Sequence, residues 1–261
     1  MLELRIGIQL ASLRLPFKKA LHTAADLGAD AVEIDARSQL KPREFSQTAL
    51  RQLRKMLEDC NLRVCAVGFR TRRGYNVLED LDRRVEATKE ALQLANRLGA
   101  PVVINHIGRV PDESEGSDWD SLLQVLTDLG RFGQRTGATL AAETGSEDGS
   151  NLARLINALP EGSLGVNFDP GNLAVNGFPV RAALDELGPH VLHVHAKDGV
   201  RDLAQGRGLE TPLGRGAVDF PELIGSLEEH NSRGYFTIER EKSDNPELEI
   251  GRSVSYLRNL F

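Results

Sequence analysis

The chain is short of cysteine and of long apolar runs, and each shortage excludes a class of protein. Cys60 and Cys65 are the only cysteines among 261 residues, so neither a disulfide framework nor a multi-cysteine zinc module is expected. No apolar run approaches the roughly 20 residues that cross a bilayer. The segment Met1 to Leu10 lacks the basic and apolar regions of a signal peptide. We therefore expect a soluble, cytoplasmic protein with no membrane partner.

Excess positive charge is also absent. The chain has 32 Lys and Arg against 38 Asp and Glu, a net charge of −6. Phosphate binding needs clustered Lys and Arg, so nucleic acid is not an expected partner. Neither G-x-G-x-x-G nor G-x4-G-K-[ST] follows the first apolar run, which argues against a nucleotide-binding open sheet. No linker or low-complexity stretch interrupts the chain, and we expect one domain over residues 1–261.

A loose repeat organises the chain. Stretches with helical spacing end in a glycine, and a short apolar run follows each of Gly28, Gly99, Gly137, Gly188 and Gly234. Glycine suits the left-handed residue that closes a helix, so each position is interpreted as a helix end that leads into a strand. The runs are short and almost wholly apolar, which is typical of strands buried on both faces in a parallel sheet.

This pattern predicts eight strands, at about 3–9, 31–35, 63–68, 101–106, 138–143, 164–169, 191–195 and 235–239. Eight strand–helix units in 261 residues favour a single (β/α)8 TIM barrel, with a doubly wound open sheet as the rival. The long loops, 70–79, 108–118 and 199–216, all follow strands. They are therefore expected on the C-terminal face, where barrel active sites are built.

Four polar residues end successive predicted strands: Glu143, Asp169, His195 and Glu239. The ends of neighbouring parallel strands converge, so three carboxylates and one imidazole should meet, with too much negative charge to stay unpaired. A divalent metal would resolve the repulsion. The oxygen-rich ligand set favours Mn²⁺ or Mg²⁺, and Co²⁺ or Zn²⁺ could also bind.

Further polar residues are expected near the same strand ends. His106 is a candidate donor to a substrate oxygen, and Glu33 a candidate to orient a substrate hydroxyl or to pair with a basic residue. Lys197 is expected either to contact an anionic substrate or to pair with a carboxylate. Residues 70, 72 and 73, all arginines, form either a lid over an anionic group or a solvated charge run. His193 is expected to point away, into the helix layer.

Three segments carry a resemblance to a known family: Val166 to Asn172, His193 to Asp198 with its H-x-K-D, and Leu213 to Phe220 with its G-x-G. Together with Ile6 to Gln9 and Ala31 to Ile34, they resemble the sugar isomerase/epimerase family with xylose-isomerase-like TIM barrels. The resemblance spans almost the whole chain. It implies a single divalent metal held by the four strand-end residues.

In ketose epimerases of that family, the glutamates matching Glu143 and Glu239 also move the proton, and an arginine at the place of Arg201 contacts the substrate. Two positions depart from the epimerase pattern. Asn172 stands where those enzymes often carry a histidine, and Gly149 where they carry a second glutamate. Asn172 is nevertheless counted among the expected substrate contacts.

The sequence thus predicts a metal-dependent isomerase or epimerase of a ketose or similar α-hydroxy carbonyl compound. A metal-stabilised enediolate would be its intermediate, with Glu143 and Glu239 transferring the proton from its two faces. A metal-dependent dehydratase of a keto-polyol, of the inosose type, and a non-catalytic binding barrel are the alternatives. A nuclease like endonuclease IV uses three zinc ions and would need many more His and carboxylate ligands, whereas only His106 and His195 of the six histidines are expected to reach the mouth of the barrel. The expected partner is a small carbohydrate, and a homo-oligomer is left open.

Overall fold

Eight parallel strands close into a barrel in the computed structural model, which describes residues 4–202 and 207–260. The barrel strands are β1 (Ile6–Gln9), β2 (Ala31–Asp35), β3 (Arg63–Gly68), β4 (Val102–Asn105), β5 (Thr139–Glu143), β6 (Gly165–Phe168), β7 (Val191–Ala196) and β10 (Phe236–Ile238). The barrel is closed because β1 pairs with both β2 and β10. The predicted TIM barrel is confirmed, and the open sheet is excluded.

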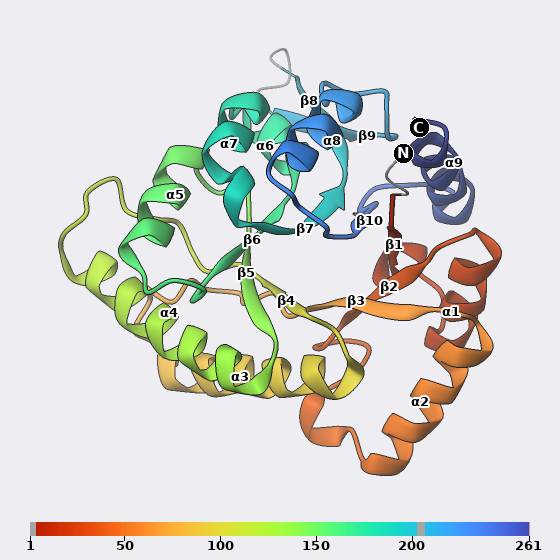
Figure 1. The fold of residues 1–261 in the computed structure, drawn as a ribbon, viewed down its shortest axis with the longest axis horizontal. Coiled ribbons are helices and arrows are strands. Elements are labelled where there is room, and N and C mark those ends of the chain that lie inside the picture. Colours follow the sequence, from red (N-terminus) through yellow and green to blue (C-terminus); the bar gives the residue numbers. More distant parts are fainter. Residues whose placement is uncertain (1–3, 203–206, 261) are drawn as a thin grey trace.

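Helices surround the strands, as Figure 1 shows. They are α1 (Phe17–Asp26), α2 (Gln47–Asp59), α3 (Leu81–Leu98), α4 (Ser117–Thr136), α5 (Gly149–Ala158), α6 (Pro170–Asn176), α7 (Val180–Leu187), α8 (Phe220–Glu229) and α9 (Pro246–Arg258), with short 3₁₀ turns at Leu10–Leu13, Pro42–Glu44 and Gly188–His190. Each long helix buries one apolar stripe, which on α3 includes Ala91, Leu92 and Ala95. These stripes pack on the outward faces of the strands and form the main core. Within the described ranges, no helix is long and apolar enough to cross a membrane.

The prediction that a left-handed glycine closes each helix is confirmed at three of the five glycines. Gly28, Gly99 and Gly137 have φ values of +85°, +74° and +88°. Gly188 instead has φ −47° and continues into the 3₁₀ turn. After α8 the left-handed residue is Asn231, with φ +58°, since asparagine tolerates this conformation. Gly234 has a different role: a Cβ there would collide with the backbone of residue 192, so this glycine permits close approach to β7.

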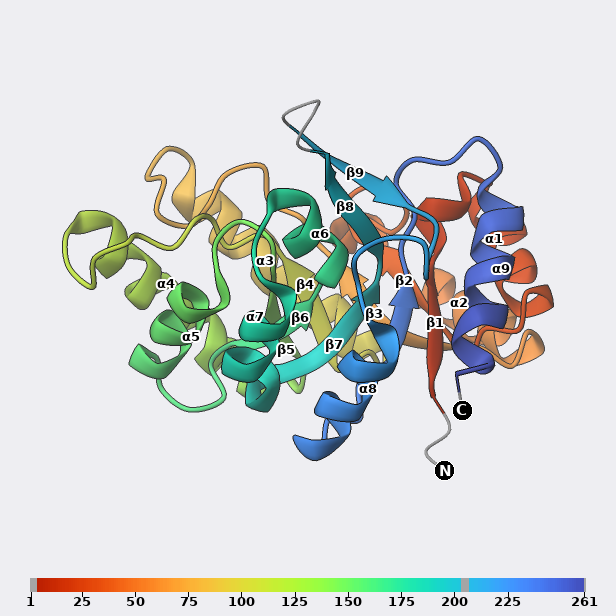
Figure 2. The same ribbon diagram turned by 90° about the horizontal axis from the view of Figure 1, so that it is seen from above.

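Segment 199–216, expected to be a loop, contains an antiparallel hairpin. Strands β8 (Asp198–Asp202) and β9 (Arg207–Thr211) pair with each other and project from the barrel, as seen in Figure 2. The buried carboxylate of Asp198 anchors the hairpin base by accepting backbone N–H groups from Gly199, Gly214, Gly216 and Val218. The Asp of the H-x-K-D segment therefore shapes this loop.

The barrel interior is unusually polar for a TIM barrel, whose inner layers are normally filled by branched apolar residues. Among the described residues, a small apolar cluster separate from the main core is formed by Ala66, Val102, Ile104 and Ala141 on neighbouring strands. Around it, the buried polar side chains include Gln9, Glu33, Asn167, His193, His195 and Thr237. Burying so many polar groups costs stability unless each finds a partner, so this layer points to a functional site.

Candidate metal centre

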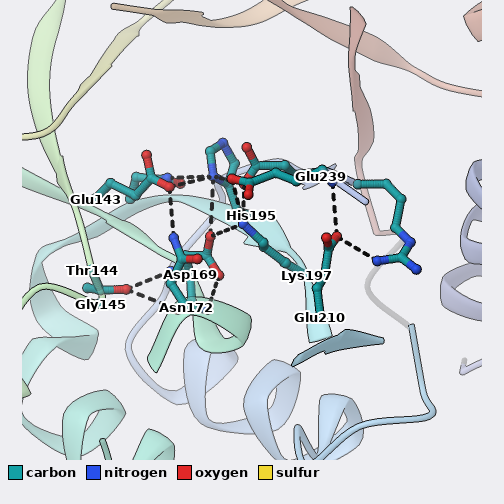
Figure 3. A network of polar contacts seen from close by, with 12 residues as sticks. Glu143, Thr144, Gly145, Asp169, Asn172, His195, Lys197, Glu210 and Glu239 are labelled. Carbon is teal, nitrogen blue, oxygen red and sulfur yellow. Dashed lines mark hydrogen bonds and ion pairs between the residues drawn. The ribbon is translucent and has the colours of Figure 1, made fainter. Parts of the chain in front are cut away.

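The four strand-end residues predicted as metal ligands come together. Glu143 ends β5, His195 lies in β7, and Asp169 and Glu239 directly follow β6 and β10. One ligand atom from each lies within 4.8 Å of those from the other three, and all four side chains are buried. Figure 3 shows their polar groups turned toward one another. This buried cluster could hold a metal ion.

His195 presents Nδ1 to the three carboxylates. This nitrogen lies 3.2 Å from Oε2 of Glu239, 3.6 Å from Oε1 of Glu143 and 3.8 Å from Oδ2 of Asp169. Burial disfavours the imidazolium, but the surrounding carboxylates, Glu33 first, raise the pKa of His195 well above its ordinary value. The carboxylates thus favour the protonated form of His195, whose positive charge would partly neutralise the cluster.

The pKa values of the three carboxyl groups shift in different directions. Burial opposes the ionisation of Glu143 and Glu239, yet their hydrogen bonds and cationic neighbours hold the pKa of each below its usual range. Burial raises the pKa of Asp169, because Lys197 and His195 compensate it only in part. Oδ2 of Asp169 has no hydrogen-bond partner among the described residues. A buried carboxylate oxygen without a donor is a ready ligand for a cation.

Two basic side chains neutralise the cluster further. The ammonium of Lys197, 3 % exposed, lies 3.0 Å from Glu241, 3.4 Å from Glu239 and 3.9 Å from Asp169. It therefore pairs with carboxylates, one of the two expected roles. Arg70, beyond β3, forms ion pairs with both Glu143 and Glu239. Of the three arginines on this loop, Arg70 is the one that reaches the cluster through an ion pair in the described structure.

Glu33 and Gln9 each contact one of the four proposed ligands: Glu33 contacts His195, and Gln9 contacts Glu239. Oε2 of Glu33 lies 2.8 Å from Nε2 of His195, so Glu33 pairs with a basic residue, as one of its two predictions stated. The side-chain amide of Asn167 lies 3.1 Å from Nδ1 of the same ring. Gln9 was not anticipated, although it ends the apolar run Ile6–Gln9 just as the four ligands end theirs.

The expected orientation of His193 was wrong. Residues two apart on a strand point the same way, so His193 lies inside the barrel with His195. Their rings meet edge to face with centroids 5.9 Å apart. Burial, together with the charge of His195, lowers the pKa of His193 well below its ordinary value, which keeps the ring neutral.

His106 and Asn172 lie at the outer edge of the cluster. Nε2 of His106 is 3.0 Å from Oε2 of Glu143, and the His106 side chain is 44 % exposed, so it borders the mouth of the barrel as expected. The amide of Asn172 donates a hydrogen bond of 3.0 Å to Oε1 of Glu143. Both residues therefore touch the same glutamate from the solvent side.

Arg201 is placed apart from this group. It is exposed on β8, and its guanidinium packs over Gly177 at the end of α6. In the described structure it makes no hydrogen bond or ion pair with the four ligands, and its substrate-binding role stays a prediction. At Gly149 a Cβ would collide with Ala183, so this position serves the contact between α5 and α7.

A model of the family described as xylose isomerase-like TIM barrel matches residues 21–260. The rhizopine catabolism protein MocC of Rhizobium meliloti is 28 % identical over 64 % of this chain and 60 % of its own length. The chain therefore aligns with less than two thirds of that relative. An inosose dehydratase of Bacillus thuringiensis (strain Al Hakam) is 22 % identical over 73 % of both proteins.

Solved structures share the fold over nearly the whole chain. A xylose isomerase domain protein from Planctomyces limnophilus superposes with a TM-score of 0.86 at 26 % identity, covering 98 % of this chain and 97 % of that one. A xylose isomerase-like TIM barrel protein from Mycobacterium smegmatis, in complex with magnesium, gives 0.77 at 18 % identity, with 98 % and 95 % covered. D-psicose 3-epimerase from Clostridium cellulolyticum H10 gives 0.77 at 14 %, with 98 % and 99 % covered. With the family model matching most of its length, this chain belongs to the xylose isomerase-like TIM barrel family.

Proposed function

We propose that this protein is a divalent-metal-dependent enzyme that moves a proton on a carbon next to a carbonyl group of a sugar-like substrate. Isomerisation or epimerisation of an α-hydroxy ketone is the reaction that we favour. Glu143, Asp169, His195 and Glu239 would hold the metal, and Glu143 and Glu239 would also transfer the proton. His106 and Asn172, which border the mouth, would contact the substrate.

The position of Arg70 between the two glutamates carries this proposal. Glu143 and Glu239 come from β5 and β10, which β6 and β7 separate in the barrel. The guanidinium of Arg70 nevertheless pairs with both, at 3.4 Å from Oε1 of Glu143. One nitrogen of Arg70, Nη2, therefore reaches both carboxylates, so the two lie close enough together to act on one small substrate, such as an enediol formed from an α-hydroxy ketone.

The bound metal and the two glutamates would have different roles in the reaction. A bound divalent ion would stabilise the negative charge that develops on the substrate oxygens. Both glutamates are ionised at neutral pH, since the pKa of each lies below its usual range, and each is thus ready to accept a proton. One would take the proton from carbon. To return a proton to the neighbouring carbon, the same carboxyl would give back the proton that it has just taken. To return a proton to the opposite face, the other glutamate would first have to take one up from a substrate hydroxyl or from water.

The donor set also suggests which metal binds. Three carboxylates and one imidazole are mainly hard oxygen ligands, which favour Mn²⁺ or Mg²⁺ over a thiophilic ion. The magnesium complex of the related barrel from Mycobacterium smegmatis supports the same assignment. Zn²⁺ and Co²⁺ remain chemically suitable for this set of donors.

Dehydration of a keto-polyol is the second candidate. Two observations favour it: curated relatives named inosose dehydratase, and departure from the epimerase pattern at Asn172 and Gly149. Both reactions begin by removing a proton next to a carbonyl. They differ in the next step, because a dehydratase expels a hydroxide from the adjacent carbon instead of returning the proton.

Proton exchange in deuterated water tests the proposal. The wild-type protein, loaded with Mn²⁺ or Mg²⁺, would be incubated with a panel of ketoses, hydroxy-keto acids and inososes, and deuterium incorporation would be followed by NMR. We expect exchange at the carbon next to the carbonyl, and product identity then separates isomerase from dehydratase. Glu143→Gln and Glu239→Gln should each abolish the exchange.

Metal content must be measured for each variant, because both glutamates are also proposed ligands. Glutamine keeps an oxygen that can still ligate, which makes it a better test than alanine. A glutamine variant that retains its metal and exchanges protons at the wild-type rate would remove that glutamate from the proton-transfer role. Absence of exchange with every substrate in the wild-type protein would contradict the proposed chemistry itself.

A further inference from the structure

Glu33 lies on the far side of His195 from the three carboxylates. Its Oε2 is 2.8 Å from Nε2 of the ring, while Nδ1 faces Glu143, Asp169 and Glu239. Glu33 is 3 % exposed and His195 is 0 % exposed, so no bulk water competes for this contact. The two ring nitrogens thus have two separate functions, one toward Glu33 and one toward the ligand cluster.

Gln9 holds Glu33 in place. Its side-chain amide donates hydrogen bonds to Oε1 of Glu33, at 3.1 Å, and to Oε1 of Glu239, at 3.0 Å. The carbonyl oxygen of the same amide accepts a hydrogen bond of 2.8 Å from the hydroxyl of Ser12. Both amide hydrogens and the amide oxygen are thereby used, which fixes the orientation of Gln9. Gln9 connects the carboxylate behind His195 to a carboxylate in the ligand cluster.

We propose that Glu33 is a positioning residue that keeps the proton of His195 on Nε2, so that Nδ1 presents its lone pair to the metal. A neutral imidazole carries one proton, and a carboxylate can only accept it. The carboxylate of Glu33 therefore selects the one tautomer that leaves Nδ1 free. This inference rests on the metal site of the proposed function and adds a role that the four ligands do not have. Gln9 extends the same support to Glu239.

A second metal site is the competing interpretation. Glu33, His193 and His195 also offer ligand atoms within 4.8 Å of one another, and Nε2 of His193 has no hydrogen-bond partner among the described residues. The distances favour the positioning role, however. Glu33 is at hydrogen-bonding distance from His195, whereas 4.0 Å separates it from Nε2 of His193. A metal-ligating histidine generally donates its other N–H to a carboxylate or carbonyl in this way.

Metal binding to Glu33→Gln tests the inference without any substrate. Glutamine has the same shape, but its amide can donate to Nε2 and so permits the wrong tautomer. We expect Mn²⁺ and Zn²⁺ to bind to Glu33→Gln about 10–100-fold more weakly than to the wild type, measured by calorimetry or chelator competition. Glu33→Asp keeps an acceptor and should restore part of the affinity. Glu147→Gln, which alters another buried carboxyl outside the cluster, is the matched control and should bind as the wild type does.

The tautomer can be observed directly in protein labelled with ¹⁵N-histidine and loaded with diamagnetic Zn²⁺. The wild type should show a one-bond proton–nitrogen correlation for Nε2–H of His195, assigned by its loss in His195→Asn. In Glu33→Gln this correlation should shift and exchange with water at least about tenfold faster, because the strong acceptor is gone. Unchanged thermal unfolding of Glu33→Gln would show that the effect is not a general loss of structure.

Three outcomes would overturn the inference. The first is wild-type affinity together with an unchanged Nε2–H signal in Glu33→Gln. The second is a stoichiometry of two ions per chain, with one lost in Glu33→Gln and in His193→Asn, which would make Glu33 a ligand. The third is a proton on Nδ1 in the zinc-loaded wild type. If the wild type binds no divalent ion, the proposed function fails, while the same correlation in the metal-free protein still tests the contact between Glu33 and His195.

Discussion

The side-chain amide of Asn172 donates a hydrogen bond of 3.0 Å to Oε1 of Glu143, one of the two proposed proton-transfer carboxylates. The backbone N–H of Asn172 also donates a hydrogen bond of 2.7 Å to Oδ1 of Asp169, whose side chain caps the N-terminus of α6. This residue therefore contacts two proposed metal ligands with two different groups.

Replacing Asn172 by alanine should remove the side-chain hydrogen bond to Glu143 and keep the hydrogen bond from the backbone N–H of residue 172 to Asp169. A hydrogen bond to a charged group contributes about 1.5–3 kcal/mol, so we expect proton exchange to fall by about tenfold or more. The measurement is the rate of deuterium incorporation into a substrate that the wild type accepts. Asn176→Ala is the matched control, since Asn176 lies on the same helix and donates to the backbone of Gly145 and Asn172. An equal effect of both substitutions would assign the loss to the helix and not to Glu143.

Most of the barrel could be predicted because its signals are local. An apolar run between a glycine and a polar residue predicts where a strand ends. In a parallel barrel, residues at the C-terminal ends of the strands all lie on the same face of the barrel. The meeting of Glu143, Asp169, His195 and Glu239 follows from this logic alone. Gln9 carries the same signal at the end of the first strand and was missed because an amide is not a usual metal ligand.

Other features could not be predicted because they depend on contacts between distant segments. Arg70 reaches Glu239, 169 residues away, and nothing in the local sequence separates it from Arg72 and Arg73. Pairing of β8 with β9 depends on Asp198, which binds backbone groups up to 20 residues further along. The error at His193 had a different origin, since the two-residue period of a strand places it on the same side as His195.

Arg70 competes with a metal ion for Glu143 and Glu239, so Arg70→Met should tighten metal binding in the absence of substrate. Removing the positive charge of Arg70 leaves both carboxylates available to the metal ion. We therefore expect the dissociation constant of the metal to be lower by about tenfold, equivalent to about 1.4 kcal/mol. Titration of the metal-free protein with Mn²⁺ measures this. Arg72→Met, two residues along the same loop and exposed, should bind as the wild type does. Weaker binding by Arg70→Met would show that Arg70 supports the metal site.

Metal binding should strengthen as pH rises. The pKa of His195 is raised well above its ordinary value by its carboxylate neighbours, and Nδ1 must lose its proton before it can ligate. Below the pKa of His195, the affinity for Zn²⁺ or Mn²⁺ should therefore fall by about tenfold per pH unit. Calorimetry at several pH values, in buffers with different ionisation enthalpies, measures both the affinity and the proton released. An affinity independent of pH between 6 and 8 would show that the metal displaces no proton from Nδ1 of His195 in this range.

The raised pKa of His195 should also make the metal-free protein less stable as pH rises, whereas metal binding becomes stronger. A histidine whose pKa is raised in the folded state contributes stability that is complete below its unfolded pKa, about 6.5. This contribution is lost as pH rises through the higher folded value. Adding metal should reverse the trend, since a ligand at 100 times its dissociation constant stabilises the folded state by about 2.7 kcal/mol. Chelation should therefore lower the unfolding temperature most at alkaline pH.

Glu147 gives the protein a second pH dependence, independent of the metal. This side chain, 6 % exposed, lies between β5 and α5 and accepts a hydrogen bond of 3.2 Å from the backbone N–H of Val110. Burial raises the pKa of Glu147 to about 7, which the contact with Val110 and the charge of Arg109 only partly offset. Between about pH 4.5 and 7 the unfolded chain is ionised at this position while the folded chain keeps its proton. Stability should therefore decrease as pH rises through this window and change no further above it.

Glu147→Gln should remove that decrease. Glutamine retains an oxygen that can accept from Val110 and has no charge to desolvate, so the variant should be more stable than the wild type by about 2–3 kcal/mol at pH 8 and by little at pH 5. Urea unfolding across this range, in the presence of a chelator, measures the difference and keeps metal binding out of it. Glu113→Gln changes an exposed glutamate on the loop after β4 and should leave the pH profile unaltered. If the stability difference between Glu147→Gln and the wild type were the same at pH 5 and pH 8, Glu147 would be ionised in the folded protein at both. The contact with Val110 would then be a charge-assisted hydrogen bond that outweighs the cost of burial.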